Sequence, residues 1–135
     1  MRSPLRVLIV DNSIEFVESA ASLLALEPIV HLIASAQTGA DAMDKITIRN
    51  PDIVLVNWSL PDLSGLQLTQ IIKALPKPPS VVLLSLSDFP IYRSEAQQAG
   101  ADGFIPKADW STLFFPLIRE LFHVPPLLLG ALLVH

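Results

Sequence analysis

The sequence predicts an α/β fold in which a parallel five-stranded sheet is covered by helices on both faces. Five short runs rich in Val, Ile and Leu alternate with longer segments whose apolar residues recur at helical spacing. Strands that alternate with helices form parallel sheets, because each helix carries the chain back to the start of the next strand. The 135 residues have the length of one domain. We therefore predict one domain over residues 1–123 and an apolar tail over residues 124–135.

The individual elements follow from apolar spacing and from the residues that punctuate it. Ser13 can cap a first helix, and Thr38 opens a pattern that resembles a capping box. Gly65 precedes the third helix, Pro90 suits the first turn of the fourth, and a broad apolar stripe marks the fifth. The predicted strands cover residues 5–10, 29–36, 53–56, 80–85 and 101–105. The first predicted helix begins at residue 14 and is ended by Glu27-Pro28, and the third follows Gly65 and is closed by Lys77-Pro78-Pro79. The other predicted helices cover residues 38–49, 90–100 and 109–122.

Composition narrows the function classes. The chain has no cysteine, which excludes disulfides and thiolate metal sites and suits a reducing cytoplasm. A net charge of -4 with scattered Lys and Arg argues against nucleic-acid binding. The N-terminal residues have no signal-peptide pattern, so we expect a cytoplasmic protein. The apolar stretch over residues 127–134 is too short for a membrane span, which needs roughly 20 residues.

Polar residues stand at the ends of four predicted strands. Asp11 and Asn12 follow the first strand, Asn57 ends the third, Ser85 ends the fourth and Lys107 follows the fifth. In the flavodoxin-like strand order 2-1-3-4-5, these ends meet at one edge of the sheet, where ligands bind in open α/β folds. The sequence therefore predicts a functional site built from these residues.

Four segments carry a resemblance to a known family. The segments VLIVDN, PDIVLVNWSLPDLSG, VVLLS and AGADGFIPK occur in this order and spacing. Over about residues 5–122 the chain resembles the CheY-like receiver domain of two-component response regulators. The resemblance implies a flavodoxin-like fold and a role in signal transduction.

The resemblance also implies roles for individual residues. In the family, an aspartate ending the third strand takes a phosphoryl group from a histidine kinase, and two acidic residues after the first strand help to bind Mg²⁺. Asp11 matches the first of these acids. The family also has a Ser or Thr and a Lys that contact the phosphoryl group, and these are matched by Ser85 and Lys107. Phe104 matches an aromatic residue that switches rotamer in the family. Asn12 and Asn57 depart from the pattern, because they replace the second acid and the phosphoacceptor.

These departures change the expected chemistry. A carboxamide oxygen is a poor nucleophile and cannot form an acyl phosphate, so we predict no phosphotransfer at Asn57, no enzymatic activity and no cofactor. Loss of two carboxylates also weakens a site for Mg²⁺, a hard cation usually held by carboxylates. We predict that Lys107 pairs with Asp11, with Asn12 and Asn57 hydrogen-bonded between them in place of a metal.

Several alternatives stay open at this point. Asp11 can act simply as a helix cap, and Ser85 can be a plain strand-end hydroxyl. Asn57 can be a replacement for a native aspartate. A different residue, Asp62 or Ser59, can accept phosphate, although neither matches the required in-line geometry. The domain can also bind a small molecule, because a fold does not fix a function.

Surplus apolar surface predicts an interaction module. The fifth helix carries more apolar residues than one sheet face requires, and we predict that the face of the fourth and fifth helices binds a protein partner or a second copy. The tail, LLLGALLV over residues 127–134, either folds back on the domain or mediates association, since it would not stay exposed on a soluble monomer. The residues predicted for the interaction face are Phe114, Phe115, Ile118 and Phe122. We interpret the chain as a pseudo-receiver.

Overall fold

The protein was analysed as a computed structural model, which describes residues 3–124. Five strands alternate with five α-helices, and a short 3-10 turn, η1, precedes the last helix. The elements in chain order are β1 (Leu5–Val10), α1 (Ile14–Leu24), β2 (Val30–Ala36), α2 (Gly39–Arg49), β3 (Ile53–Asn57), α3 (Gly65–Lys73), β4 (Ser80–Ser85), α4 (Pro90–Gln98), β5 (Gly103–Pro106), η1 (Lys107–Asp109) and α5 (Trp110–Phe122).

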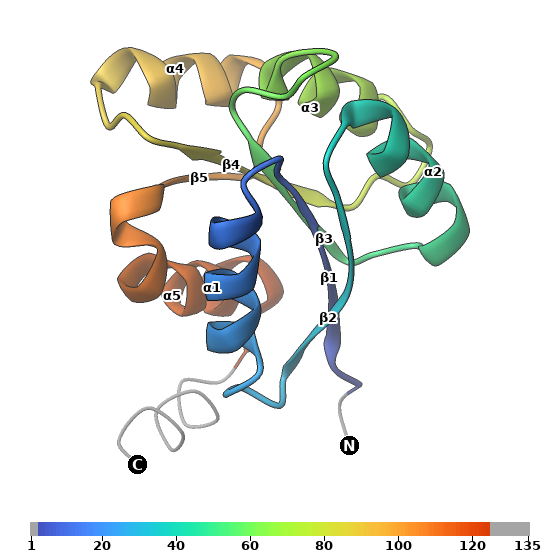
Figure 1. The fold of residues 1–135 in the computed structure, drawn as a ribbon, viewed down its shortest axis with the longest axis vertical. Coiled ribbons are helices and arrows are strands. Elements are labelled where there is room, and N and C mark those ends of the chain that lie inside the picture. The colour runs from blue at the N-terminus through green and yellow to red at the C-terminus, as the bar shows by residue number, and fades with distance from the viewer. Residues whose placement is uncertain (1–2, 125–135) are drawn as a thin grey trace.

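All strands are parallel and lie in the order β2-β1-β3-β4-β5. Helices α1 and α5 cover one face of the sheet, and α2, α3 and α4 cover the other (Figure 1). Alternate strand residues point to opposite faces, so that Val7 and Ile9 join one core cluster and Leu8 and Val10 join the other. The flavodoxin-like fold and the strand order predicted from the sequence are confirmed.

Local sequence signals place the helix starts near the carboxyl ends of the strands. The Ser13 hydroxyl accepts a hydrogen bond from the Phe16 amide at 3.3 Å, and Thr38 caps α2 through the Asp41 amide at 3.1 Å. Gly65 begins α3 so close to β3 that a Cβ atom there would collide with the carbonyl oxygen of Asn57. Glycine at this position therefore allows α3 to start directly beside the end of β3.

The region around the fifth strand differs from the prediction. The strand begins at Gly103, two residues later than expected, where the Asp102 carboxylate takes the place of a backbone oxygen as an acceptor for β4. It accepts a hydrogen bond from the Val81 amide at 2.8 Å and pairs with Lys73 at 2.9 Å. The η1 turn then delays the start of the last helix to Trp110.

The predicted interaction face is corrected by the structure. Phe114 and Ile118 are fully buried and Phe115 is 3% exposed, so these three side chains cannot form a docking surface. They face the sheet because α1 and α5 together must cover the face formed by five strands, and α5 uses these residues for that purpose. Phe122 is partly buried against the same cluster. Residues 125–135 lie outside the described part of the chain, and no helix among the described residues is long and apolar enough to cross a membrane.

Substitutions at two adjacent residues of α5 test whether its apolar stripe faces the core. We expect Phe114→Ala to lower the free energy of unfolding by about 3–5 kcal/mol, because it leaves a cavity in the core. Leu113, 37% exposed on the same helix, is the matched control, and Leu113→Ala should cost about 1 kcal/mol or less. Urea denaturation measures both values, and equal losses would contradict the inward orientation of the stripe.

Candidate functional site

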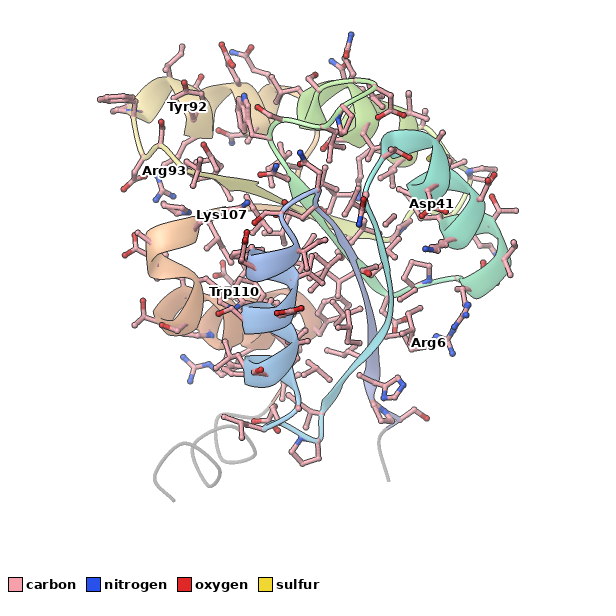
Figure 2. All side chains as sticks on the ribbon, viewed as in Figure 1. Arg6, Asp41, Tyr92, Arg93, Lys107 and Trp110 are labelled. Atoms are coloured by element: carbon pink, nitrogen blue, oxygen red, sulfur yellow. The ribbon has the colours of Figure 1, made fainter. Side chains whose placement is uncertain are left out.

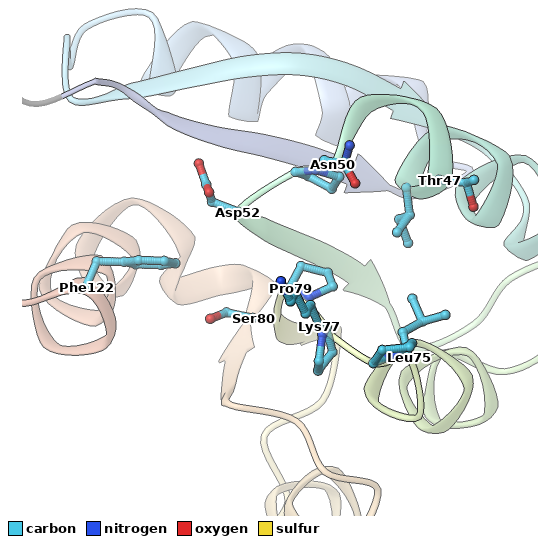
Figure 3. A pocket seen from close by; sticks show the side chains of 12 residues that line it. Thr47, Asn50, Asp52, Leu75, Lys77, Pro79, Ser80 and Phe122 are labelled. Carbon is cyan, nitrogen blue, oxygen red and sulfur yellow. The ribbon is translucent and has the colours of Figure 1, made fainter.

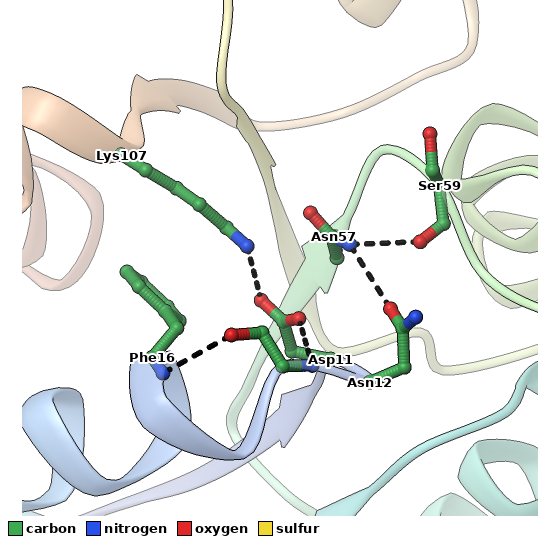
Figure 4. Close-up of polar contacts among 7 residues, drawn as sticks. Asp11, Asn12, Phe16, Asn57, Ser59 and Lys107 are labelled. Carbon is green, nitrogen blue, oxygen red and sulfur yellow. Dashed lines mark hydrogen bonds and ion pairs between the residues drawn. The ribbon is translucent and has the colours of Figure 1, made fainter.

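The five predicted strand-end residues meet at one edge of the sheet. Asp11 and Asn12 follow β1, Asn57 ends β3, Ser85 ends β4 and Lys107 begins η1 directly after β5. Figure 4 shows Lys107 pointing toward Asp11, and Asn57 pointing toward Asn12. Beside them lies a cavity of about 360 Å³. Its lining residues are Asn12, Ser13, Asn57, Trp58, Ser59, Ser85, Leu86, Ser87, Tyr92 and Lys107.

The central contact of the site is an ion pair. The Nζ atom of Lys107 lies 2.7 Å from Oδ2 of Asp11, and the two side chains are 11% and 0% exposed. The other carboxylate oxygen, Oδ1, accepts a hydrogen bond from the Ser13 amide at 2.9 Å. The Lys107 ammonium also lies 4.5 Å from the ring centre of Phe16, close enough for a cation–π contact. The predicted pairing of Lys107 with Asp11 is therefore present, and Asp11 also caps the turn into α1.

The two asparagines form a separate polar contact. Nδ2 of Asn57 donates to the backbone oxygen of Ser59 at 2.7 Å and to Oδ1 of Asn12 at 3.3 Å. The backbone oxygen of Ser59 only accepts hydrogen bonds, so the atom facing it must be the NH₂ group of Asn57. We predicted that both amides lie between Asp11 and Lys107; instead they bond to each other and to the loop after β3. A carboxylate at position 57 would have no proton to offer this carbonyl.

Ser85 is only 3% exposed and contributes to the floor of the cavity. Its hydroxyl oxygen accepts a hydrogen bond from the Ser87 amide at 3.1 Å. This contact shapes the loop between β4 and α4, which agrees with the plain strand-end interpretation. The same hydroxyl can also offer its proton to a molecule in the cavity.

Phe104 is held in an aromatic cluster that links β5 to α4. Its ring meets Trp58 edge-on, with centres 6.1 Å apart, and Trp58 in turn meets Tyr92 edge-on at 4.9 Å. The Arg93 guanidinium lies 5.0 Å from the Phe104 ring centre and pairs with Asp88 at 3.1 Å. Figure 2 shows Tyr92 and Arg93 on α4. Phe104 is partly buried, and its rotamer is restrained by neighbours on two elements.

Tyr92, Arg93 and Phe16 are parts of this region that the sequence reasoning missed. Tyr92 and Arg93 reach the site only because α4 packs beside β5, which apolar spacing does not reveal. Phe16 was a predicted helix residue with no sign of its contact with Lys107. A Phe three residues after a helix cap is an ordinary core residue by pattern, so no sequence signal distinguished it.

Asp62, an alternative phosphate acceptor, has a structural role. Its two carboxylate oxygens accept hydrogen bonds from the amides of Gly39 and Ala40, at 2.9 and 3.0 Å. These bonds to the start of α2 hold the pKa of the Asp62 carboxyl below its ordinary value. Asp62 does not line the cavity, whereas Ser59 does. The carboxylate is thus occupied in tying the loop after β3 to α2.

The residues at this edge do not fit a Mg²⁺ site. Asp11 is the one carboxylate at the strand ends, and its Oδ2 atom is already paired with Lys107. Asn12 and Asn57 supply only neutral oxygens, and the described residues contain no group of three His, Asp or Glu side chains able to hold a metal. Because the charges of Asp11 and Lys107 cancel, the site offers no net negative charge to a divalent cation.

A larger cavity lies at the opposite edge of the sheet. It measures about 510 Å³ and is lined by the end of α2, the loop before β4 and Phe122 (Figure 3). None of the strand-end polar residues described above borders it. The functional site is therefore indicated by its chemistry rather than by cavity size.

Comparison with known proteins identifies the family. The model of the response regulator receiver domain matches residues 7–113. The chain belongs to the response regulator receiver domain family. Its fold agrees with the receiver domain of the response regulator NarL from Mycobacterium tuberculosis, which is 27% identical and has a TM-score of 0.79. That superposition covers 90% of this receiver domain and 96% of the NarL domain.

Two curated relatives are larger proteins. The protein-glutamate methylesterase/protein-glutamine glutaminase of Desulfotalea psychrophila is 34% identical over 110 residues, which cover 80% of this chain and 30% of the relative. The transcriptional regulatory protein UhpA of Escherichia coli is 33% identical over 101 residues, which cover 75% of this chain and 50% of UhpA. The receiver domain thus spans half or less of these relatives, and their names describe proteins with additional segments.

A further solved relative shows how a receiver domain meets a partner. One chain in the structure of CheY6 with the P1 domain of CheA3 from R. sphaeroides has 25% sequence identity to this chain and a TM-score of 0.78. The match covers 91% of this chain and all of the matched chain. In that structure, a protein with the fold of this chain is bound to a second protein.

Removal of one partner tests the buried ion pair. We expect Lys107→Met to lower the free energy of unfolding by about 3–5 kcal/mol, because it leaves the Asp11 carboxylate buried without a counter-ion. The control is the double variant Asp11→Asn with Lys107→Met, which removes both charges but keeps an oxygen to accept the Ser13 amide. Chemical denaturation should find the double variant more stable than Lys107→Met; the opposite order would contradict a coupled pair.

Proposed function

We propose that this receiver domain is a pseudo-receiver, which transmits signals by binding proteins and does not accept a phosphoryl group at position 57. The supporting observation is the amide of Asn57, which stands where the family resemblance places the phosphoacceptor aspartate and donates to the Ser59 carbonyl at 2.7 Å. Phosphoryl transfer needs an electron pair directed at phosphorus. The amide lone pair is delocalised and carries no charge, so the acyl phosphate cannot form.

The ion pair supports the same proposal. Lys107 is the cation that would meet a phosphoryl group, yet it lies 2.7 Å from a fully buried carboxylate. To bind a new anion, Lys107 would have to leave Asp11 uncompensated in the interior, which is costly. The pair therefore favours one conformation of the strand ends, where a phosphorylated receiver would exchange between two.

The hydrogen bonds of Asn57 favour a native asparagine over a replaced aspartate. The Ser59 carbonyl accepts a hydrogen bond at this point, which an amide can donate and a carboxylate cannot. Asn12 is a second departure at the same edge, and its Oδ1 atom accepts from Asn57. Two departures that bond to each other are better explained by joint adaptation than by a single substitution.

A groove between β5 and α5 supports the interaction role. It has a volume of about 490 Å³ and lies on the side of the domain where Phe104 is partly exposed. The residues that line it are Phe104, Ile105, Leu113, Pro116, Leu117, Arg119 and Glu120. In this proposal the partly exposed residues of α4, β5 and α5 replace the buried aromatic residues of α5 as the binding face, for a protein partner or a second copy.

Reaction with a small acyl phosphate in the presence of Mg²⁺ tests the proposal. We expect intact-protein mass spectrometry to find no phosphoryl adduct on this chain, because position 57 has no nucleophile. The comparison is the double variant Asn12→Asp with Asn57→Asp, which restores both carboxylates and should gain an adduct that base hydrolyses. An acyl phosphate on the unmodified chain would overturn the pseudo-receiver assignment, and peptide mapping would identify its site.

A further inference from the structure

A small apolar groove lies between the end of α1 and the edge strand β2, far from the strand-end site. Its volume is about 280 Å³. The lining residues are Ala21, Leu24, Ala25, Val30, His31 and Leu32. Leu26, next to this groove in sequence, is 72% exposed although it is a large apolar side chain. The groove and the exposed leucine give this corner of the domain an apolar surface.

The described chain ends beside the same part of the core. Val124 is 2% exposed and belongs to the core cluster that includes Leu24 and Val30, two residues of the groove. The chain reaches this position because His123 has a positive φ of 55° and the Val124 amide donates to the Arg119 oxygen at 3.2 Å. Such a turn folds the chain back after a helix. Val124, the last residue that the structure describes, is thus directed against the domain.

The sequence after this point has the composition that the groove requires. Residues 127–134, LLLGALLV, contain no charged side chain. At about 3.3 Å per residue, the ten residues after Val124 can extend roughly 33 Å, which is comparable to the diameter of a small domain. We propose that residues 127–134 of the same chain dock at this corner, placing part of their apolar side chains in the groove between α1 and β2 and covering Leu26. This inference is independent of the proposed function.

Glu27 supplies a second observation at this corner. Glu27 is 2% exposed, and its Oε1 atom accepts a hydrogen bond from the Ile29 amide at 3.3 Å. Within the described residues, the buried Oε2 atom has no hydrogen-bond partner. A buried carboxyl oxygen normally has one, so Oε2 is available to accept a hydrogen bond from a segment that docks at this corner. The backbone amides of a docked segment would provide the donor.

Paramagnetic broadening tests the proposal on the complete chain. The absence of native cysteine makes Ala131→Cys a unique site for a nitroxide label, and the substitution leaves every leucine of the segment in place. We expect the label to broaden the amide signals of Ala25, His31 and Leu32 at the groove. The matched reference is Gln97 and Gln98 on α4, across the sheet, whose signals should keep the intensity of the reduced sample.

Two further samples separate the possible occupants. In a mixture of labelled unenriched chain with isotope-enriched chain that carries no label, broadening of the enriched groove signals would mean exchange between copies and would overturn the same-chain proposal. Ala25→Glu places a charge at this exposed groove position and should abolish the broadening while the spectrum stays folded. Absent broadening in the first sample, or equal broadening at α4, would also overturn the proposal.

Discussion

The ion pair between Lys107 and Asp11 is the contact on which the strand-end site depends. It joins the turn after β1 to the turn after β5, two segments separated by most of the chain. Both charges are largely shielded from water, so each is tolerated only in the presence of the other. With the pair formed, the site is electrically neutral, and the remaining polar groups can be amides and hydroxyls. In this account, the Lys107 ammonium takes the place of a metal ion in neutralising Asp11.

The loop after β3 connects the strand-end site to the rest of the domain. Because Asn57 donates to Ser59, the loop after β3 is fixed from within, and Asp62 fixes the same loop from outside at the start of α2. Trp58 in this loop contacts Phe104 and Tyr92, which lie on β5 and α4. The strand ends, the loop and the α4–β5 side of the domain therefore form one packed unit, which suits the constant binding surface that we propose.

Much of the architecture could be predicted from the sequence. Strands and helices have clear periodicities here, and the parallel order brings Asp11, Asn57, Ser85 and Lys107 to one edge whatever the details of packing. The pairing of Lys107 with Asp11 could be predicted because these are the two charged residues among the five at that edge. These conclusions depend on topology and charge, which the order of residues along the chain largely determines.

Features that depend on helix orientation were not predicted. The stripe of Phe114, Phe115 and Ile118 was assigned to a docking face, but a sheet of five strands needs that stripe for its own core. The contacts of Arg93 with Phe104 and of Phe16 with Lys107 depend on how α4 and α1 are rotated about their axes. The partner of Asn57 proved to be a backbone oxygen two residues away, and side-chain composition gives no information about such a contact.

Thermal unfolding with and without Mg²⁺ tests the central claim most directly, because a ligand that binds only the folded state raises its stability. The account predicts no change in the melting temperature of this chain, since Lys107 already neutralises Asp11. It predicts a rise for the double variant Asn12→Asp with Asn57→Asp, which restores a carboxylate site. A rise of similar size in the unmodified chain would mean that the strand ends bind the cation despite the ion pair, and would contradict the account.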